Sequence, residues 1–224
     1  MISKEAQPYV MIGCVVAMVI SIFFISRGCK DSVAYTKDQL QRLETDAEFR
    51  AQDTAEFLGT RTDVLIVYLE VPGSKGLEEI RDAFKNVLTA NGKNIVGVEA
   101  FQPTEGGPYF NPLGWTYTLE EMQDLVSQSP KADVIVSLAG VPVYDPDAID
   151  AVMESFTPMV VGFFPGQVGD VAAWFETGIV EMAIMHSPAK GAAEPTTPRE
   201  RYDNRFRMFT PDSDVPPPMP MMMM

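Results

Sequence analysis

The fold is decided by the stretch DVLIVYLEVPGSKGLEEIRDAFKNVL, residues 63–88. It opens with a continuous β-branched and apolar run, passes through a turn rich in Gly and Pro, and continues with apolar residues at helical spacing. A strand that is apolar at every position is buried on both faces, as in a parallel sheet covered by helices. The stretch therefore predicts one strand–helix unit of an α/β fold.

The same pattern repeats along the chain. Four further strand-like runs follow, at 95–98, 134–138, 159–164 and 182–185, and amphipathic helices alternate with them. A helix is marked by the capping box of Thr118 and Glu121. Because crossovers between parallel strands are right-handed, the repeats predict an α/β, three-layer, doubly wound sheet of five mainly parallel strands in the order 2-1-3-4-5.

Composition excludes several classes of protein. The 224 residues carry 17 Lys and Arg against 31 Asp and Glu, a net charge of -14. Nucleic-acid binding needs a basic footprint, so no nucleic-acid partner is expected. One His and two Cys are too few for a zinc site of nitrogen and sulfur ligands. We expect no metal and no cofactor.

The N-terminus predicts membrane attachment. No charged residue occurs from Ala6 to Ser26, and this length suits a transmembrane helix. We expect a retained signal anchor; the alternatives are a lipoprotein cleaved before Cys29 and a cleaved secretory signal. The expected location is the inner membrane, single-pass, with a periplasmic domain, although the Lys and Arg residues after the span favour a cytoplasmic domain.

The predicted organisation has four parts: an anchor over 1–30, a helical stalk over 31–61, an α/β domain over 62–189 and a Pro- and Met-rich tail over 190–224 that is partly disordered. A helix is predicted over 37–58, with a narrow Ala-rich stripe. Either this stripe packs on its own domain or it forms a parallel coiled coil through which the protein self-associates. Within the tail, a short segment near 202–210 is predicted to dock on the domain.

The binding crevice of a doubly wound sheet lies at the carboxyl ends of the strands where the winding reverses. The loops after the first and third strands place candidate contact residues there: Glu70, Gly73, Ser74, Gly140, Tyr144 and Asp145. Gly73 and Ser74 precede a helix N-terminus, which can hold an anion, although an ordinary strand–helix turn also explains them. Helix capping, however, is an adequate explanation of Asp145.

The connection over 101–117 is long and rich in aromatic residues. Its rings either bind a sugar or a partner, or close the loop onto its own domain. The candidates for contact are Tyr109, Phe110, Trp115 and Tyr117.

No catalytic constellation is present in the sequence, so the protein is not expected to be an enzyme. The Gly-x-Ser-x-Gly elbow is missing, and the lone His186 ends a strand, where a structural or solvent-facing role is expected. Crevice carboxylates, with Glu70, Glu99 and Asp170 as candidates, leave a hydrolase-like enzyme as a third hypothesis.

Residues 62–187 resemble one lobe of the type I, sugar-type periplasmic binding proteins and of LacI-like ligand domains. The resemblance rests on the runs 63–67, 76–84, 132–137 and 158–163, and on 206–212, which is similar to a strand that these proteins place after the lobes. It implies a non-enzymatic domain that senses a small polar solute or binds a protein. A second lobe has no room in 188–224, so the family's ligand residues are not transferred. The alternative is a structural accessory subunit of a membrane complex.

Overall fold

The computed structural model describes residues 35–70, 74–101, 118–142, 157–162, 174–186 and 194–213. The chain divides into two units, Met1–Thr36 and Lys37–Met224. The predicted membrane anchor lies outside the described residues. Within the described ranges, no helix has the length and apolarity to span a bilayer.

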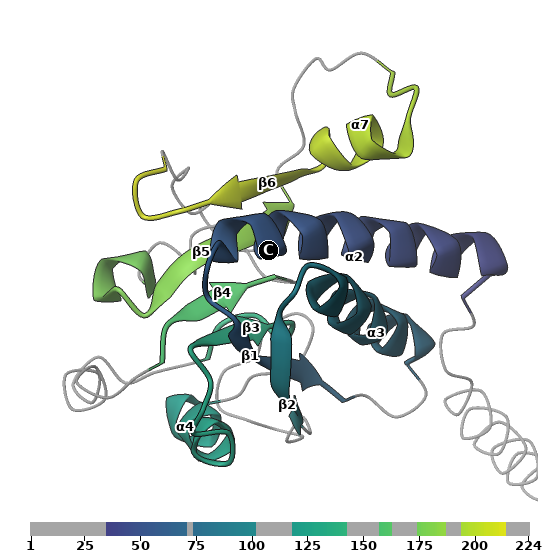
Figure 1. Ribbon diagram of the computed structural model, residues 1–224. Coiled ribbons are helices and arrows are strands. Elements are labelled where there is room, and N and C mark those ends of the chain that lie inside the picture. Colours follow the sequence, from purple (N-terminus) through teal and green to yellow (C-terminus); the bar gives the residue numbers. More distant parts are fainter. Residues whose placement is uncertain are drawn as a thin grey trace, which may run out of the picture. The chain divides into compact units, whose positions relative to one another are not determined.

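Helices and strands alternate along most of the second unit (Figure 1). In chain order the elements are α2 (Lys37–Leu58), β1 (Asp63–Leu69), α3 (Lys75–Ala90), β2 (Asn94–Phe101), α4 (Leu119–Ser127), β3 (Val134–Ser137), β4 (Met159–Val161), β5 (Val180–His186), α7 (Pro198–Asp203) and β6 (Phe206–Phe209).

The strands form one sheet in the order β2-β1-β3-β4-β5-β6. The first five are parallel in the predicted order, so that prediction is confirmed. The prediction of five strands is wrong by one, because β6 joins the sheet antiparallel to β5. The four residues of β6 include Arg207 and lack a β-branched run, so the strand pattern did not mark them, whereas the family resemblance placed a strand within 206–212.

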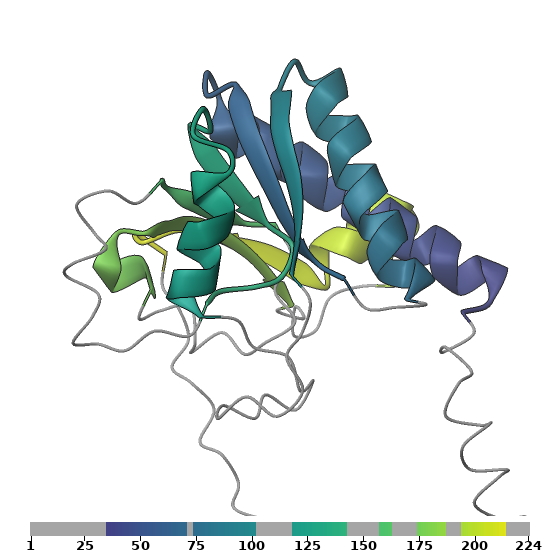
Figure 2. The same cartoon turned by 90° about the horizontal axis from the view of Figure 1, so that it is seen from below.

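Helices cover both faces of this sheet (Figure 2). We call the side covered by α2 and α3 the α2 face, and the side covered by α4 the α4 face. Side chains alternate along each strand, so Val64 and Ile66 of β1 join the cluster on the α2 face, whereas Leu65 and Val67 join the one on the α4 face. The continuous apolar character of β1 and β3 follows from this double burial.

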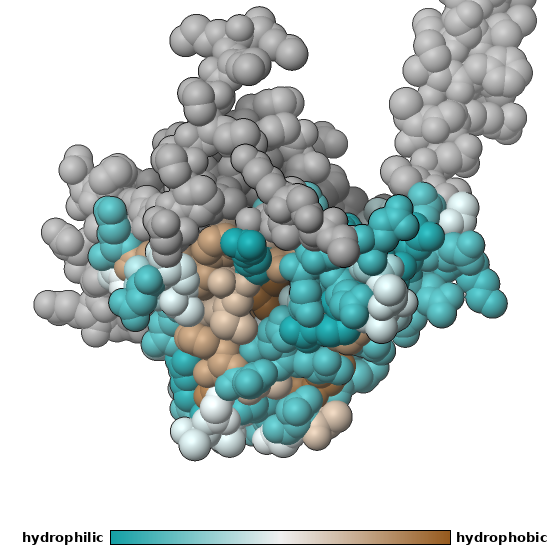
Figure 3. Space-filling model, turned by 90° about the horizontal axis from the view of Figure 1, so that it is seen from above, coloured by the Kyte–Doolittle hydropathy of each residue, from teal (hydrophilic) through white to brown (hydrophobic). Residues whose placement is uncertain are grey.

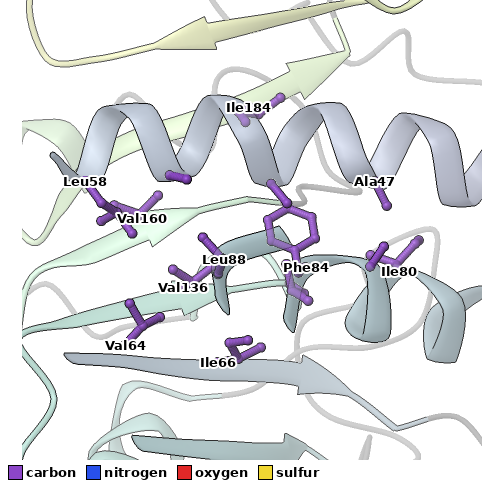
Figure 4. Packing of buried hydrophobic residues seen from close by; sticks show 14 of the residues in the cluster. Ala47, Leu58, Val64, Ile66, Ile80, Phe84, Leu88, Val136, Val160 and Ile184 are labelled. Atoms are coloured by element: carbon purple, nitrogen blue, oxygen red, sulfur yellow. The ribbon is translucent and has the colours of Figure 1, made fainter. Parts of the chain in front are cut away.

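Phe84 of α3 is a central core residue on the α2 face (Figure 4). It is fully buried and lies against Gly162, just after β4. A Cβ on Gly162 would stand 2.6 Å from Cε1 of Phe84. The absence of a side chain at 162 therefore allows the ring to reach the sheet.

The helix predicted over 37–58 is observed over those residues. It does not form a separate stalk, because Ala47, Ala51, Ala55 and Leu58 are buried in the α2-face cluster (Figure 4). Small residues in the stripe let the helix lie close to its neighbours. The predicted self-association through a coiled coil therefore lacks a free apolar seam over 47–58.

The α4 face is covered by α4 and by the residues before β5. The predicted capping box is confirmed: Thr118 Oγ1 accepts from the Glu121 N–H at 3.2 Å, and Glu121 Oε2 accepts from the Thr118 N–H at 2.7 Å. Leu119, Met122 and Trp174 are buried on this face.

Part of the segment assigned to the tail belongs to the sheet. Helix α7 begins with a capping box of Thr197 and Glu200, and β6 pairs with β5 from Ala183↔Phe209 to His186↔Phe206. The predicted docking of the segment near 202–210 is thus observed. Phe206 is buried on the α2 face and Phe209 on the α4 face, so β6 completes the core on both sides.

Candidate functional site

The winding of the sheet reverses between β1 and β3. The connection after β1 runs through α3 on the α2 face, and the connection into β3 comes through α4 on the α4 face. β1 and β3 are neighbours, in register from Val64↔Val134 to Val67↔Ser137. The carboxyl ends of these strands form the edge at which open α/β sheets bind ligands.

A small hollow of about 20 Å³ lies at the end of β1. We call it the β1 hollow; it is lined by Tyr68, Leu69, Glu70, Ser74, Leu77, Glu78 and Arg81. Its volume fits about one water molecule. Two of the predicted contact residues, Glu70 and Ser74, are brought together there.

Backbone contacts fix both of these residues. The N–H of Glu70 donates to the carbonyl of Phe101 at 2.8 Å, which extends the pairing of β1 with β2. Ser74 is the N-cap of α3, and its carbonyl accepts from the N–H of Leu77 at 3.1 Å. The Ser74 hydroxyl makes no capping hydrogen bond, so it is available to a ligand at the start of the helix.

Arg81 gives the β1 hollow a permanent positive charge. Its guanidinium stacks over the ring of Tyr68, 5.1 Å from the centroid, and Nη1 lies 3.5 Å from the Tyr68 hydroxyl. The Nε hydrogen bond to Asp82 Oδ1, at 2.8 Å, raises the pKa of Arg81 above its ordinary value. With Glu70 and Glu78, the hollow holds two carboxylates and one guanidinium.

Gly140 follows β3, as predicted, but its surroundings favour a structural role. Its φ of +86° lies in the left-handed region that favours glycine. The hydroxyl of Ser137, at the end of β3, donates to the carbonyl of Gly140 at 2.6 Å. The loop is therefore closed on itself by a short side-chain contact.

The other predicted contact residues lie outside the described ranges; these are Gly73, Tyr109, Phe110, Trp115, Tyr117, Tyr144 and Asp145. Asp170, a candidate of the enzyme hypothesis, lies outside them as well. Their roles remain predictions. His186 is described: it is exposed at the end of β5, and its ring meets Phe206 edge-on at 5.6 Å. In the described residues, no three His, Cys, Asp or Glu side chains gather as metal ligands.

Sequence reasoning did not find a second, larger hollow of about 440 Å³. We call it the α2–α7 hollow; it is lined by Asp53, Glu56, Phe57, Arg199, Tyr202, Asp203, Phe206 and Met208. It forms where the C-terminal segment meets the first helix of the domain. The Arg and aromatic residues that alternate after residue 198 were the sequence signal that could have indicated this hollow.

Polar contacts hold the two sides of this hollow together. Asp53 of α2 accepts from the Tyr202 hydroxyl at 3.0 Å and from Arg199 Nη1 at 2.9 Å. Burial, followed by the charge of Asp53, raises the pKa of Tyr202 above its ordinary value. The contact between Asp53 and Tyr202 joins residues 149 positions apart in the sequence.

A buried arginine lies next to this contact region. The guanidinium of Arg50 stacks on the ring of Phe206, 4.1 Å from its centroid. Burial lowers the pKa of Arg50 to about 10, and the charges of Tyr202 and Asp46 oppose this effect. Asp46 also accepts from Arg205 Nη1 at 3.0 Å.

No family model matches the chain, and no curated protein matches its sequence. The chain is similar in structure to solute-binding proteins of ABC transporters. One is from Burkholderia graminis, in complex with D-arabinose: 14% identity, TM-score 0.41, covering 63% of this chain and 46% of that one. Another is a sugar-binding protein from Bacillus halodurans: 18% identity, TM-score 0.41, 63% and 45% covered.

A protein from Mycobacterium smegmatis is 12% identical, with a TM-score of 0.44 and with 75% of this chain and 58% of that one covered. The chain spans about half the length of these structures.

Proposed function

We propose that this protein is a non-enzymatic binding module that holds a small polar solute at the carboxyl edge of β1 and β3. The observation that carries the proposal is the coincidence of the winding reversal with the polar side chains of the β1 hollow. Glu70, Ser74 and Arg81 supply acceptor, hydroxyl and donor groups within one small region. This combination suits a ligand rich in hydroxyl groups.

The residues that the structure describes contact a solute at this edge from one side only. The affinity is therefore expected to be weak, because much of the ligand surface stays in water. Two of the similar solved proteins bind D-arabinose and D-allose, so pentoses and hexoses are the first probes.

The test is a titration of the ¹⁵N-labelled domain with D-arabinose, D-ribose and D-allose, followed by amide NMR shifts. Shifts are expected at Ser74, Leu77 and Arg81. Glu70→Gln should weaken the response, whereas Glu120→Gln, an equal change of charge on exposed α4, should leave it intact. No shift at these amides with any of the three sugars would overturn the proposal.

The same variant tests the enzyme hypothesis. If incubation of the domain with glycosides released free sugar, and Glu70→Gln abolished that release without unfolding the domain, the non-enzymatic assignment would be wrong. Unchanged glycosides after prolonged incubation are the expected result.

We also propose that the solute site stands outside the cytoplasm, held by the N-terminal segment as a membrane anchor. The uncharged run from Ala6 to Ser26 supports attachment. Protease added to intact spheroplasts should digest the domain if it is extracytoplasmic. Protection of the domain until the membrane is lysed would contradict this placement.

A further inference from the structure

The α2–α7 hollow has apolar side chains in its lining, one of which is open to solvent. Among the residues that the structure describes, Met208 of β6 is the only large hydrophobic side chain that is exposed, at 40%. It lines the hollow together with Phe57 and Phe206. Figure 3, viewed from the side on which β6 lies in Figure 1, shows apolar surface bordered by hydrophilic residues.

The rim of the hollow is acidic. Asp53, Glu56 and Asp203 oppose the single positive charge of Arg199, which leaves a net of -2. Arg199 is already engaged, since Nη1 pairs with Asp53 and Nε with Asp203, each at 2.9 Å. Glu56 is exposed and has no ion pair within the described part of the chain.

The charges decide which occupant fits. Residues 31–224 contain 14 basic and 30 acidic side chains, a net of -16. A second copy of this domain would bring like charge to an acidic rim, which opposes association. A basic occupant gains from both the rim and the whole domain.

We propose that the α2–α7 hollow is a docking site for a basic segment of a protein partner, with one Lys or Arg side chain inserted into it. The methylene stem packs on Met208 and Phe57, and the cationic group reaches the carboxylate of Glu56. A hollow of about 440 Å³ has room for one long side chain and its flanking residues. This interaction is independent of the solute function proposed above.

The experiment uses the full-length protein labelled with ¹³C at the methionine methyl groups and an acetylated, amidated heptapeptide of alternating Leu and Lys. The Met208 methyl signal, assigned with Met208→Leu, is expected to shift on titration. Glu56→Gln is expected to weaken binding about two- to five-fold, the range of a partly exposed ion pair. Glu44→Gln removes an equal charge from an exposed position of α2 outside the hollow and should have no such effect.

Three outcomes would overturn the inference. The Met208 methyl signal does not move, or the two variants weaken binding equally, so that only overall charge matters. Alternatively, butylammonium competes as tightly as the peptide, which would indicate a site for small organic cations. The sugar titration serves as a separate check, because it reports on Ser74 and not on Met208.

Discussion

The two faces of the sheet bury different kinds of side chain. The α4 face buries thioethers and an indole: Met122, Met159, Met185 and Trp174. The α2 face buries an acid and a base, Asp46 and Arg50, beside its apolar cluster. Apolar cores tolerate exchanges of similar volume, whereas a buried charge depends on particular partners. We infer that the α2 face fixes the position of the helices packed on it more strictly than the α4 face does.

The largest effect is expected from the core of the α2 face itself. Phe84→Ala should lower the free energy of unfolding by about 3–5 kcal/mol, because the ring is fully buried and leaves a cavity. Gly162→Ala should cost about 1–3 kcal/mol, since the added Cβ meets the ring edge. Urea denaturation measures both. Wild-type stability of Gly162→Ala would show that the ring moves aside freely.

Strand β6 allows a direct comparison of the faces, because Phe206 and Phe209 lie on opposite sides of it. Each replacement by Ala should destabilise by about 3 kcal/mol. Phe206→Ala should cost about 1 kcal/mol more, since it also removes the ring on which Arg50 stacks. Arg50→Met in a double-mutant cycle isolates that difference. Equal losses for the two Phe variants would contradict the stricter role of the α2 face.

Tyr202 tests the polar contacts of the α2 face. Tyr202→Phe should cost about 1.5–3 kcal/mol at neutral pH, because the hydroxyl donates to the charged Asp53. The folded-state pKa of Tyr202 is raised, so its contribution is complete below the unfolded pKa near ~10 and declines as pH rises above that value.

Wild type should therefore keep its advantage over Tyr202→Phe up to about pH 10 and begin to lose it between about pH 10 and pH 11. The lowered pKa of Arg50 acts in the opposite direction over this range in both proteins. Thermal unfolding of the pair across pH gives the measurement. A constant difference up to pH 11 would refute the assignment.

The smallest effect is expected on the α4 face, at the start of α4. Thr118→Ala should cost about 1 kcal/mol, because the hydroxyl no longer accepts from the Glu121 N–H. Thr118→Ser keeps the acceptor and serves as the control. If both variants lost the same stability, packing of the Thr methyl group would be the cause and not the cap.

The sequence predicted those features that depend on local pattern. The bounds of α2 and the capping box of α4 each follow from short stretches read in isolation, and the order of the parallel strands follows from their repeat together with the right-handed crossover rule. At the candidate site, Glu70 and Ser74 were found because strand ends and helix starts are local as well. The contact between Asp53 and Tyr202 is not local, and nothing near either residue marks the other.

Arg50 shows, within one helix, the same limit of prediction from local sequence pattern. It lies between Ala47 and Ala51 on the buried side of α2, where an apolar stripe leads one to expect a residue without charge. Its environment is completed by Phe206 and Tyr202, which follow about 150 positions later. The α2–α7 hollow was missed for this reason, since its walls come from the two ends of the domain.

The long separation of these partners has a consequence for synthesis on the ribosome. α2 is made first, and its basic side chain lacks its aromatic cover until residues near 206 have been translated. We therefore expect nascent chains that end before α7 to expose α2 to protease, and chains extended past β6 to protect it. Arrested chains of the two lengths would show this directly, and equal protection would mean that α2 docks without the final strand.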